Sequence, residues 1–165
     1  DQDVLTHIIR KPTNLSKVEG IVKHAKKIGL IVKGYFIVGL PGETKEQMQK
    51  TFDLAKNLKF DAAGIFIATP LPGTDMYKLC KEKGYLRPGF DFERINYGTG
   101  NIVTPDFTPE EVEQMVSENI LKINMSLLYR NPVKFFKKYF QLVKRNPKVL
   151  FDYVFFLRKK SKKKT

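Results

Sequence analysis

The sequence has very little cysteine: Cys80 is the single one among 165 residues. One cysteine cannot form an internal disulfide, so the class of extracellular disulfide scaffolds is excluded. We expect Cys80 to behave as a small buried hydrophobic side chain on a helix.

Long apolar runs are also missing. No run approaches the length that a membrane-spanning helix needs, and no signal-peptide pattern opens the sequence. We therefore predict a cytoplasmic location. The sequence starts with Asp1 rather than Met, so we expect it to be a piece of a longer polypeptide.

Acidic residues are scarce at one end only. Residues 1–129 hold 17 Lys/Arg and 16 Asp/Glu, whereas residues 130–165 hold 13 Lys/Arg and one Asp. The net charge of +13 therefore comes almost entirely from the tail. Such an abrupt change separates a neutral body from a basic appendage.

The stretch Leu30 to Thr44, LIVKGYFIVGLPGET, organises the neutral body. Its first nine residues are mostly β-branched or aromatic, which predicts a strand over Leu30 to Val38 that is covered on both faces. The turn Gly39 to Gly42 follows, and Thr44 with Gln47 forms a capping box that begins a helix. A phosphate-binding P-loop is disfavoured, because Gly42 is followed by Glu43, whose carboxylate suits a helix N-terminus instead.

The same unit then recurs. A helix over residues 45–58 is predicted to bury Met48, Phe52, Ala55 and Leu58, and a second strand over Ala62 to Ala68 ends at TPLPGT. The right-handed crossover rule predicts adjacent parallel strands with both following loops at the same end. Because two parallel strands leave unpaired edges, we predict the later part of a larger α/β barrel or open sheet, with the missing strands upstream.

Helices and loops flank these strands. The preceding helix is predicted to start at Asn14 or Ser16 and to end at Gly29, with an apolar stripe of Leu15, Val18, Ile21, Val22, Ala25 and Ile28. One or two helical turns are expected before Pro12, and a short helix is expected from Thr74 to Gly84. An ordered loop should cover Tyr85 to Pro105, with a short strand at Asn101 to Val103, before a helix capped by Thr108 and Glu111.

The basic tail contains a small repeat. Arg130-Asn131-Pro132 recurs as Arg145-Asn146-Pro147, and each copy predicts the start of a short helix. The first segment interleaves aromatic residues with lysines, and the second carries an apolar run that leads into a basic tail. We predict three parts: residues 1–86 with the βα units, residues 87–129 with the crossing loop and a helix packed on them, and residues 130–165 as a helical, aromatic-rich tail.

The pair of motifs GLPGET and ATPLPGT resembles the fifth and sixth βα units of the radical S-adenosylmethionine superfamily. The start, DQDVLTHIIRKPTNLSKVEGIV, resembles the fourth helix of that barrel, and IIRKP with TPLPGT is most similar to members carrying an upstream cobalamin-binding domain. The resemblance covers residues 1–86 closely and the rest loosely. It implies the carboxyl-terminal part of a partial TIM barrel, followed here by an α-helical tail.

The resemblance also implies a function. Family members use a [4Fe–4S] cluster to cleave S-adenosylmethionine reductively to a 5′-deoxyadenosyl radical, and with cobalamin they transfer methyl groups or rearrange rings. The cluster motif CxxxCxxC is absent here, and one thiolate does not hold a cluster. The ligands of the cluster and any cobalamin domain are therefore expected upstream in the same polypeptide, and this chain by itself is expected to be inactive.

The part of the cofactor site that falls in this chain is its far wall. The family places the apolar side chain two residues before the strand-end glycine on the adenine, which here is Ile37. Backbone around Gly39, Ala68 and Thr69 would line the same pocket. Ile37 is equally compatible with a place in the barrel core, and no residue of the chain stands out as an acid, base or nucleophile.

Three partners are open for the tail. Its lysines and aromatics would suit an anionic membrane surface on the cytoplasmic face, and this fits better than a nucleic-acid arm. The tail could also only pack against the barrel. The substrate implied is a small or lipid-like molecule, and an RNA-modifying radical enzyme is the alternative.

Overall fold

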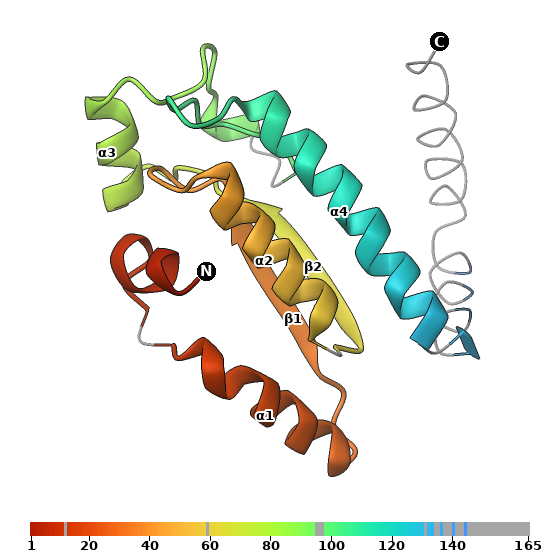
Figure 1. Cartoon of the computed structure of the whole chain (residues 1–165). Helices are drawn as coiled ribbons and strands as arrows, with labels where there is room; N and C mark the ends of the chain where they lie inside the picture. Colours follow the sequence, from red (N-terminus) through yellow and green to blue (C-terminus); the bar gives the residue numbers. More distant parts are fainter. Residues whose placement is uncertain are drawn as a thin grey trace. The chain divides into compact units, whose positions relative to one another are not determined.

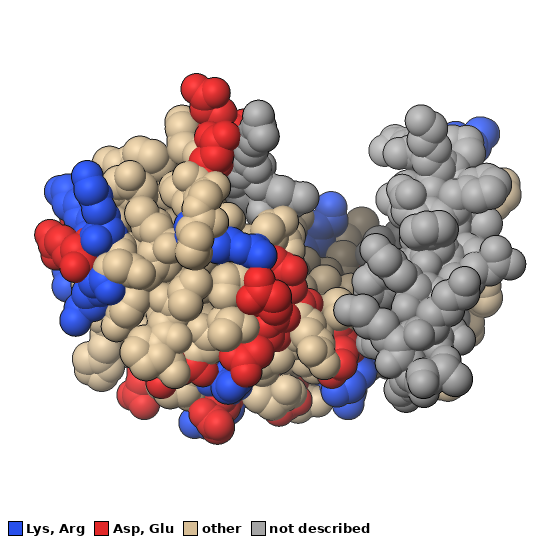
Figure 2. All heavy atoms as spheres, turned by 90° about the horizontal axis from the view of Figure 1, so that it is seen from above, with Lys and Arg blue, Asp and Glu red and all other residues tan. Residues whose placement is uncertain are grey.

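The fold is known from a computed structural model, which describes residues 1–165 apart from 12, 59, 95–97, 131, 134–135, 137–139, 141–143 and 145–165 (Figure 1). It comprises two compact units, Asp1–Asn124 and Met125–Thr165. In the described part of the chain, the first unit holds both strands and most of the helices. Lys/Arg and Asp/Glu side chains lie interspersed over the face of it shown in Figure 2, as expected for a segment of nearly balanced charge.

Two parallel strands form the sheet. β1 (Lys33–Val38) pairs with β2 (Ala62–Ile67), in a register that sets Lys33 beside Ala62 and Val38 beside Ile67. The predicted adjacency, direction and common end of the two loops are confirmed. β1 begins three residues later than predicted, because Val32 bonds to Asp61 instead: its N–H donates to the carboxylate at 3.0 Å and its carbonyl accepts from the Asp61 N–H.

Two helices pack beside the strands. α2 (Lys45–Asn57) covers one face of the pair (Figure 1) and begins with the predicted capping box of Thr44 and Gln47. Its side chains Met48, Phe52 and Ala55 are buried, as predicted, and so is Leu58 just beyond it. Burying one such large side chain contributes roughly 1.5–3 kcal/mol, so α2 is the main apolar cover of the sheet.

The helix before β1 is α1 (Leu15–Lys27), and Asn14 caps it by accepting the N–H of Ser16. Its Val22 joins Leu58 and Phe60 in a small core, against which Phe36 packs. The predicted apolar stripe is wrong in part, because Ile21 and Ile28 are exposed. Val22 is buried and Val18 packs against the same core, so the stripe is covered only in part.

The remaining elements of the first unit begin with η1 (Val4–Ile8), a π-helix where helical turns were predicted. After β2 follow α3 (Asp75–Glu82), capped by Thr74, and η2 (Phe92–Arg94). Cys80 on α3 is buried, as predicted. The predicted strand Asn101 to Val103 is reduced to one antiparallel bridge between Ile102 and Leu86.

The last helix is α4 (Pro109–Arg130), and its predicted capping box is confirmed by the mutual bonds of Thr108 and Glu111. The helices predicted after Asn131 and Asn146 fall largely outside the described residues. Residues 132, 133, 136, 140 and 144 are described, and all five are helical. Within the described part of the chain, no helix has the length and apolar character needed to cross a membrane.

Candidate functional site

The carboxyl ends of the two strands define the candidate site. Val38 and Ile67 are partners in the register, so the segments after them leave the sheet side by side. The Ala68 N–H donates to the Val38 carbonyl at 2.8 Å, which ties the start of the second segment to the end of β1. Gly39, Ala68 and Thr69, which were predicted to share a pocket, therefore lie at one end of the sheet. Ligands of open α/β sheets and barrels bind at this end.

The turn after β1 requires glycine. Gly39 and Gly42 have φ of 78° and 83°, in the left-handed region that other residues avoid. A Cβ on Gly39 would lie 3.1 Å from Cγ1 of Val112 on α4. The backbone of the turn is thus approached closely by a neighbouring helix, and only a residue without a side chain fits there.

A buried carboxylate holds this turn. The Glu43 side chain accepts the N–H of Gly39 at 2.8 Å and the N–H of Leu40 at 3.1 Å, both on Oε2. Glu43 has 0% of its surface exposed, and its Oε1 has no hydrogen-bond partner among the described residues. Burial raises the pKa of Glu43, while the two backbone N–H groups act in the opposite direction.

From the sequence, the Glu43 carboxylate was expected only to suit the N-terminus of the following helix. The structure adds that its carboxylate satisfies two backbone donors of the strand-end turn. The sequence feature that could have indicated this role is an acidic residue placed between a glycine turn and a capping threonine. Because Glu43 is fully enclosed, it shapes the turn and has no surface for a ligand.

The open face of the sheet carries Ile37. The register pairs Ile37 with Phe66 and Tyr35 with Gly64. The side chains of Tyr35, Ile37 and Phe66 lie on the face opposite Phe36 and its core partners. Ile37 is 50% exposed and Phe66 is 40% exposed. The rings of Tyr35 and Phe66 have centroids 6.0 Å apart. The described residues thus leave an apolar, half-open surface directly before the strand-end turns.

Ala68 and Thr69 differ from Ile37 in that both are buried. The Thr69 hydroxyl lies 3.4 Å from the Ile67 carbonyl and donates to it. The side chains of Ala68 and Thr69 therefore point into the interior. At these two positions, only backbone groups are left to contact a ligand.

Two hollows adjoin the strand pair. One of about 480 Å³ lies between η1, the Leu40-Pro41 turn and the start of α3. The other, of about 260 Å³, runs beside β1 and includes Tyr35 and Ile37 in its lining. There is therefore room for additional atoms next to β1 and next to the turn that follows it.

The residues present do not fit an iron–sulfur cluster. Cys80 is buried, burial raises its pKa, and a cluster needs several thiolates. No group of three or more His, Cys, Asp or Glu residues able to hold a metal occurs in the part of the chain that is described. The same end of the sheet does suit an apolar group, because Ile37 and Phe66 expose hydrophobic side chains there.

An α/β strand-end site of this kind is common to many enzymes, and comparison with known proteins narrows it. No protein-family model matches the chain. It is 32% identical over 124 residues to cytidylyl-2-hydroxyethylphosphonate methyltransferase of Streptomyces wedmorensis, which covers 71% of this chain and 23% of the relative. Anaerobic magnesium-protoporphyrin IX monomethyl ester cyclase of Rubrivivax gelatinosus is 28% identical over 107 residues, or 65% of this chain and 18% of the relative.

The name of a third relative describes the modification of a tRNA. The tRNA-2-methylthio-N(6)-dimethylallyladenosine synthase of Buchnera aphidicola is 36% identical over 74 residues, which is 44% of this chain and 17% of the relative. The chain spans less than a quarter of the length of each of these three relatives. All three are radical S-adenosylmethionine enzymes, and the chain belongs to that superfamily.

Proposed function

We propose that this chain is the carboxyl-terminal part of the partial barrel of a larger radical S-adenosylmethionine enzyme. The observation that carries the proposal is the parallel pair β1–β2, whose common carboxyl end joins an open apolar face to two backbone turns. Two strands do not close a barrel, so the remaining strands belong to the rest of the polypeptide. That remainder is the first partner of this chain.

In this proposal the chain supplies the far wall of the cofactor site. Ile37 packs on the adenine, and backbone groups near Gly39, Ala68 and Thr69 border the same pocket. Two observations support this assignment of one side-chain contact and several backbone contacts. The side chain of Ile37 is half exposed, and the side chains of Ala68 and Thr69 are buried. When bound, S-adenosylmethionine supplies a radical or a methyl group. The role of these residues is to orient it and to exclude water.

The [4Fe–4S] cluster is assigned to the upstream part of the polypeptide, because the residues present here do not fit it. A cobalamin-binding domain is assigned there too. Methyl transfer to a small or lipid-like substrate is the favoured reaction, and the similarity to a methyltransferase over 71% of the chain supports it. Rearrangement of a ring is the second possibility within the same chemistry.

RNA modification is a second candidate function. The relative that is named as a tRNA-modifying synthase supports it over a shorter stretch of 74 residues. The basic tail would then contact phosphates. The methyltransferase relative matches a longer stretch, 124 residues, so we keep RNA modification as the alternative.

The test is to replace Ile37 by Asp in the full-length protein. A carboxylate against the adenine would be desolvated without a partner, and we expect S-adenosylmethionine affinity to fall about tenfold or more. Isothermal titration calorimetry measures this affinity directly. Ile31→Asp is the matched control, because Ile31 is equally apolar and is exposed before the other end of β1. Equal affinity in folded Ile37→Asp and wild-type protein would contradict the proposed wall.

A further inference from the structure

One flank of α1 exposes large apolar side chains. Ile21 and Ile28 are 64% and 61% exposed. They lie seven residues apart, about two helical turns, and the Ile28 N–H still donates to the His24 carbonyl at 3.2 Å, so both belong to one side of the same helix. Leu30 is 57% exposed, and its N–H donates to the Ala25 carbonyl at 3.0 Å, which brings it back to the end of the helix. We call Ile21 and Ile28 the apolar flank of α1.

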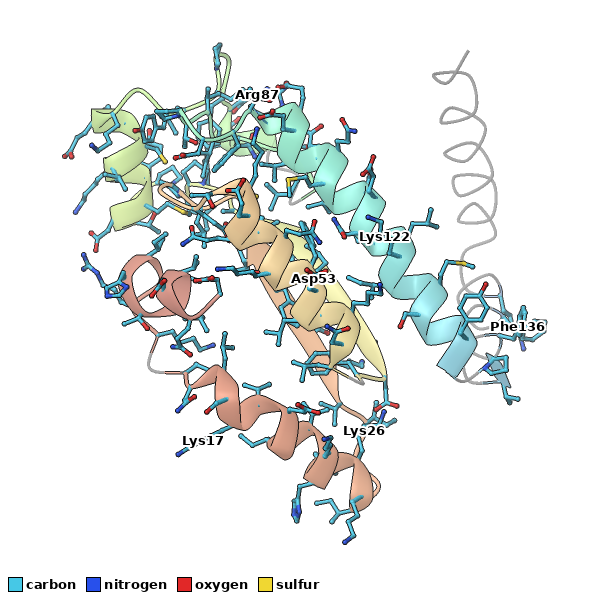
Figure 3. All side chains as sticks on the ribbon, in the orientation of Figure 1. Lys17, Lys26, Asp53, Arg87, Lys122 and Phe136 are labelled. Carbon is cyan, nitrogen blue, oxygen red and sulfur yellow. The ribbon has the colours of Figure 1, made fainter. Side chains whose placement is uncertain are left out.

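The opposite flank of α1 is polar and faces α2. The ammonium group of Lys26, which Figure 3 labels, lies 3.4 Å from the carboxylate of Asp61, the residue before β2. Glu19, Lys23 and Lys26 also line a hollow of about 230 Å³ whose other wall is the end of α2. On this side, the neighbour of α1 is therefore α2.

The apolar flank points away from α2. At about 100° of rotation per residue, Ile21 and Ile28 lie about 140° and 160° around the helix from Lys26, with the buried Val22 between the two flanks. Both helices pack on one face of the sheet, because α1 and α2 each contribute side chains to the core against which Phe36 of β1 packs. The apolar flank therefore faces the space on the far side of α1 from α2.

The sheet is open as well. In the described part of the chain, β1 pairs with β2 alone. Its other edge presents backbone N–H and C=O groups that can pair with a further strand. In an α/β barrel each strand is followed by a helix and the helices form an outer ring, so a strand added beside β1 brings a helix beside α1. The open edge of β1 and the apolar flank of α1 thus fit one and the same neighbour, a preceding βα unit.

We propose that the apolar flank binds the helix of the βα unit that directly precedes Asp1 in the full-length polypeptide. This rests on the proposed function, because it requires that the chain is the later part of a barrel, and it names the surface that holds the two parts together. More than three quarters of each relative described above lies outside the matched segment, which leaves ample length for such a unit. The residues of that helix that meet Ile21 and Ile28 should be apolar and recur at helical spacing.

A second copy of the chain is the competing occupant. A stable interface buries roughly 800 Å² of each partner, and two isoleucine side chains supply only a part of that area. A helix of the same polypeptide needs no such area, because the chain itself keeps it near α1 at a high effective concentration. The small size of the apolar flank therefore favours an intrachain partner.

The experiment places the photo-cross-linking residue p-benzoylphenylalanine at position 21 or 28 of the full-length protein, with position 23 as the matched control. Lys23 lies on the polar flank of the same helix and is exposed. Irradiation joins the benzophenone group to atoms in direct contact with it, and mass spectrometry of the digest identifies the joined peptides. We expect adducts within the monomer between α1 and peptides upstream of Asp1, at least about tenfold more abundant from positions 21 and 28 than from position 23.

A second measurement uses ordinary substitutions. Ile21→Ser/Ile28→Ser should lower the urea concentration at which the full-length protein is half unfolded, because it places hydroxyls in an apolar contact, whereas Lys23→Ser should leave this midpoint unchanged. The proposal is overturned by adducts that join two copies, by adducts confined to residues 1–165, by the absence of adducts or by an unchanged midpoint of the double variant. Such a result together with weaker S-adenosylmethionine binding by Ile37→Asp would overturn this docking surface alone, and the proposed function would stand.

Discussion

At the scale of single residues, Glu43 is the most constrained group of the candidate site. It is enclosed, it accepts two backbone N–H groups, and its second oxygen has no partner among the described residues. A buried donor left without a partner costs about 1–3 kcal/mol. The two hydrogen bonds from Gly39 and Leu40 therefore offset part of the free-energy cost of burying the carboxylate. The geometry of the turn depends on these bonds.

Removal of the Glu43 side chain should destabilise the protein. Glu43→Ala leaves two buried N–H groups unpaired, so we expect the free energy of unfolding to fall by roughly 2–4 kcal/mol. Urea unfolding followed by circular dichroism measures this change. A loss below about 0.5 kcal/mol, the level of an ordinary surface substitution, would show that the two hydrogen bonds do not hold the turn.

Glu43 should also give stability a particular dependence on pH. Burial raises its pKa above the ordinary value of 4.5, so the folded state binds the proton more tightly than the unfolded state. The contribution of this group to stability is then complete below pH 4.5 and is lost as the pH rises through the folded-state pKa. Relative to Glu43→Gln, which does not titrate, wild type should lose stability as the pH rises from 4.5.

The control for this pH dependence is Glu46→Gln. Glu46 is exposed, and its pKa is lowered by its own backbone N–H and by the Thr44 hydroxyl. Its contribution to stability is present above pH 4.5 and lost as the pH falls, so the two glutamates should show opposite signs. Unfolding curves collected across this pH range distinguish them. The same sign for both would contradict the raised pKa of Glu43.

At the scale of elements, Arg87 joins the crossing loop to α4. The guanidinium of Arg87, which Figure 3 labels, donates to the Gly100 carbonyl at 3.0 Å and to Glu110 at 2.7 Å, and it lies 3.4 Å from Glu113. Glu113 in turn accepts the Gly100 N–H at 2.8 Å. The planar guanidinium group has several N–H donors in a fixed arrangement and can bond to all of these partners at once, whereas the ammonium group of a lysine cannot.

Replacing Arg87 by Lys should therefore loosen this junction although the charge is kept. We expect a loss of about 1 kcal/mol in the free energy of unfolding and faster amide hydrogen exchange at Gly100. Hydrogen exchange followed by mass spectrometry measures the local effect. Lys122→Ala is the control, because Lys122 is exposed on the same helix and should leave exchange at Gly100 unchanged. Unchanged exchange in Arg87→Lys would show that charge alone holds the loop.

At the scale of the whole molecule, the chain matches only one part of longer relatives. It spans less than a quarter of each relative described above, and its pair of strands leaves both outer edges unpaired within the described residues. In the proposed enzyme, this chain thus contributes one wall of the cofactor site, and the ligands of the [4Fe–4S] cluster come from the rest of the polypeptide.

Anaerobic reconstitution of the isolated chain with iron and sulfide should accordingly yield no stoichiometric cluster. The physical reason is that Cys80 is a single, buried thiol with a raised pKa, and a cluster is held by several thiolates. Iron and acid-labile sulfide assays check the result, with Cys80→Ser as the matched control. One cluster per wild-type chain would contradict the assignment of the ligands to the upstream polypeptide.

The local features of this protein could be predicted from its amino-acid sequence. The capping boxes at Thr44 and Thr108, the glycine turn and the order of the two strands were all predicted, because each depends on residues within a few positions of one another. The strand-end location of Gly39, Ala68 and Thr69 followed as well, since parallel strands joined by one helix place their carboxyl ends together.

Which side chains those elements bury could not be predicted, because burial depends on packing between segments that are distant in the sequence. β1 starts at Lys33 because Asp61, which lies 29 residues beyond Val32, bonds to that residue's N–H. Ile21 and Ile28 are exposed although Val22 of the same stripe is buried, and Glu43 is enclosed because the turn wraps around its carboxylate. These outcomes depend on contacts between distant segments. A periodic pattern of apolar residues carries no information about such contacts.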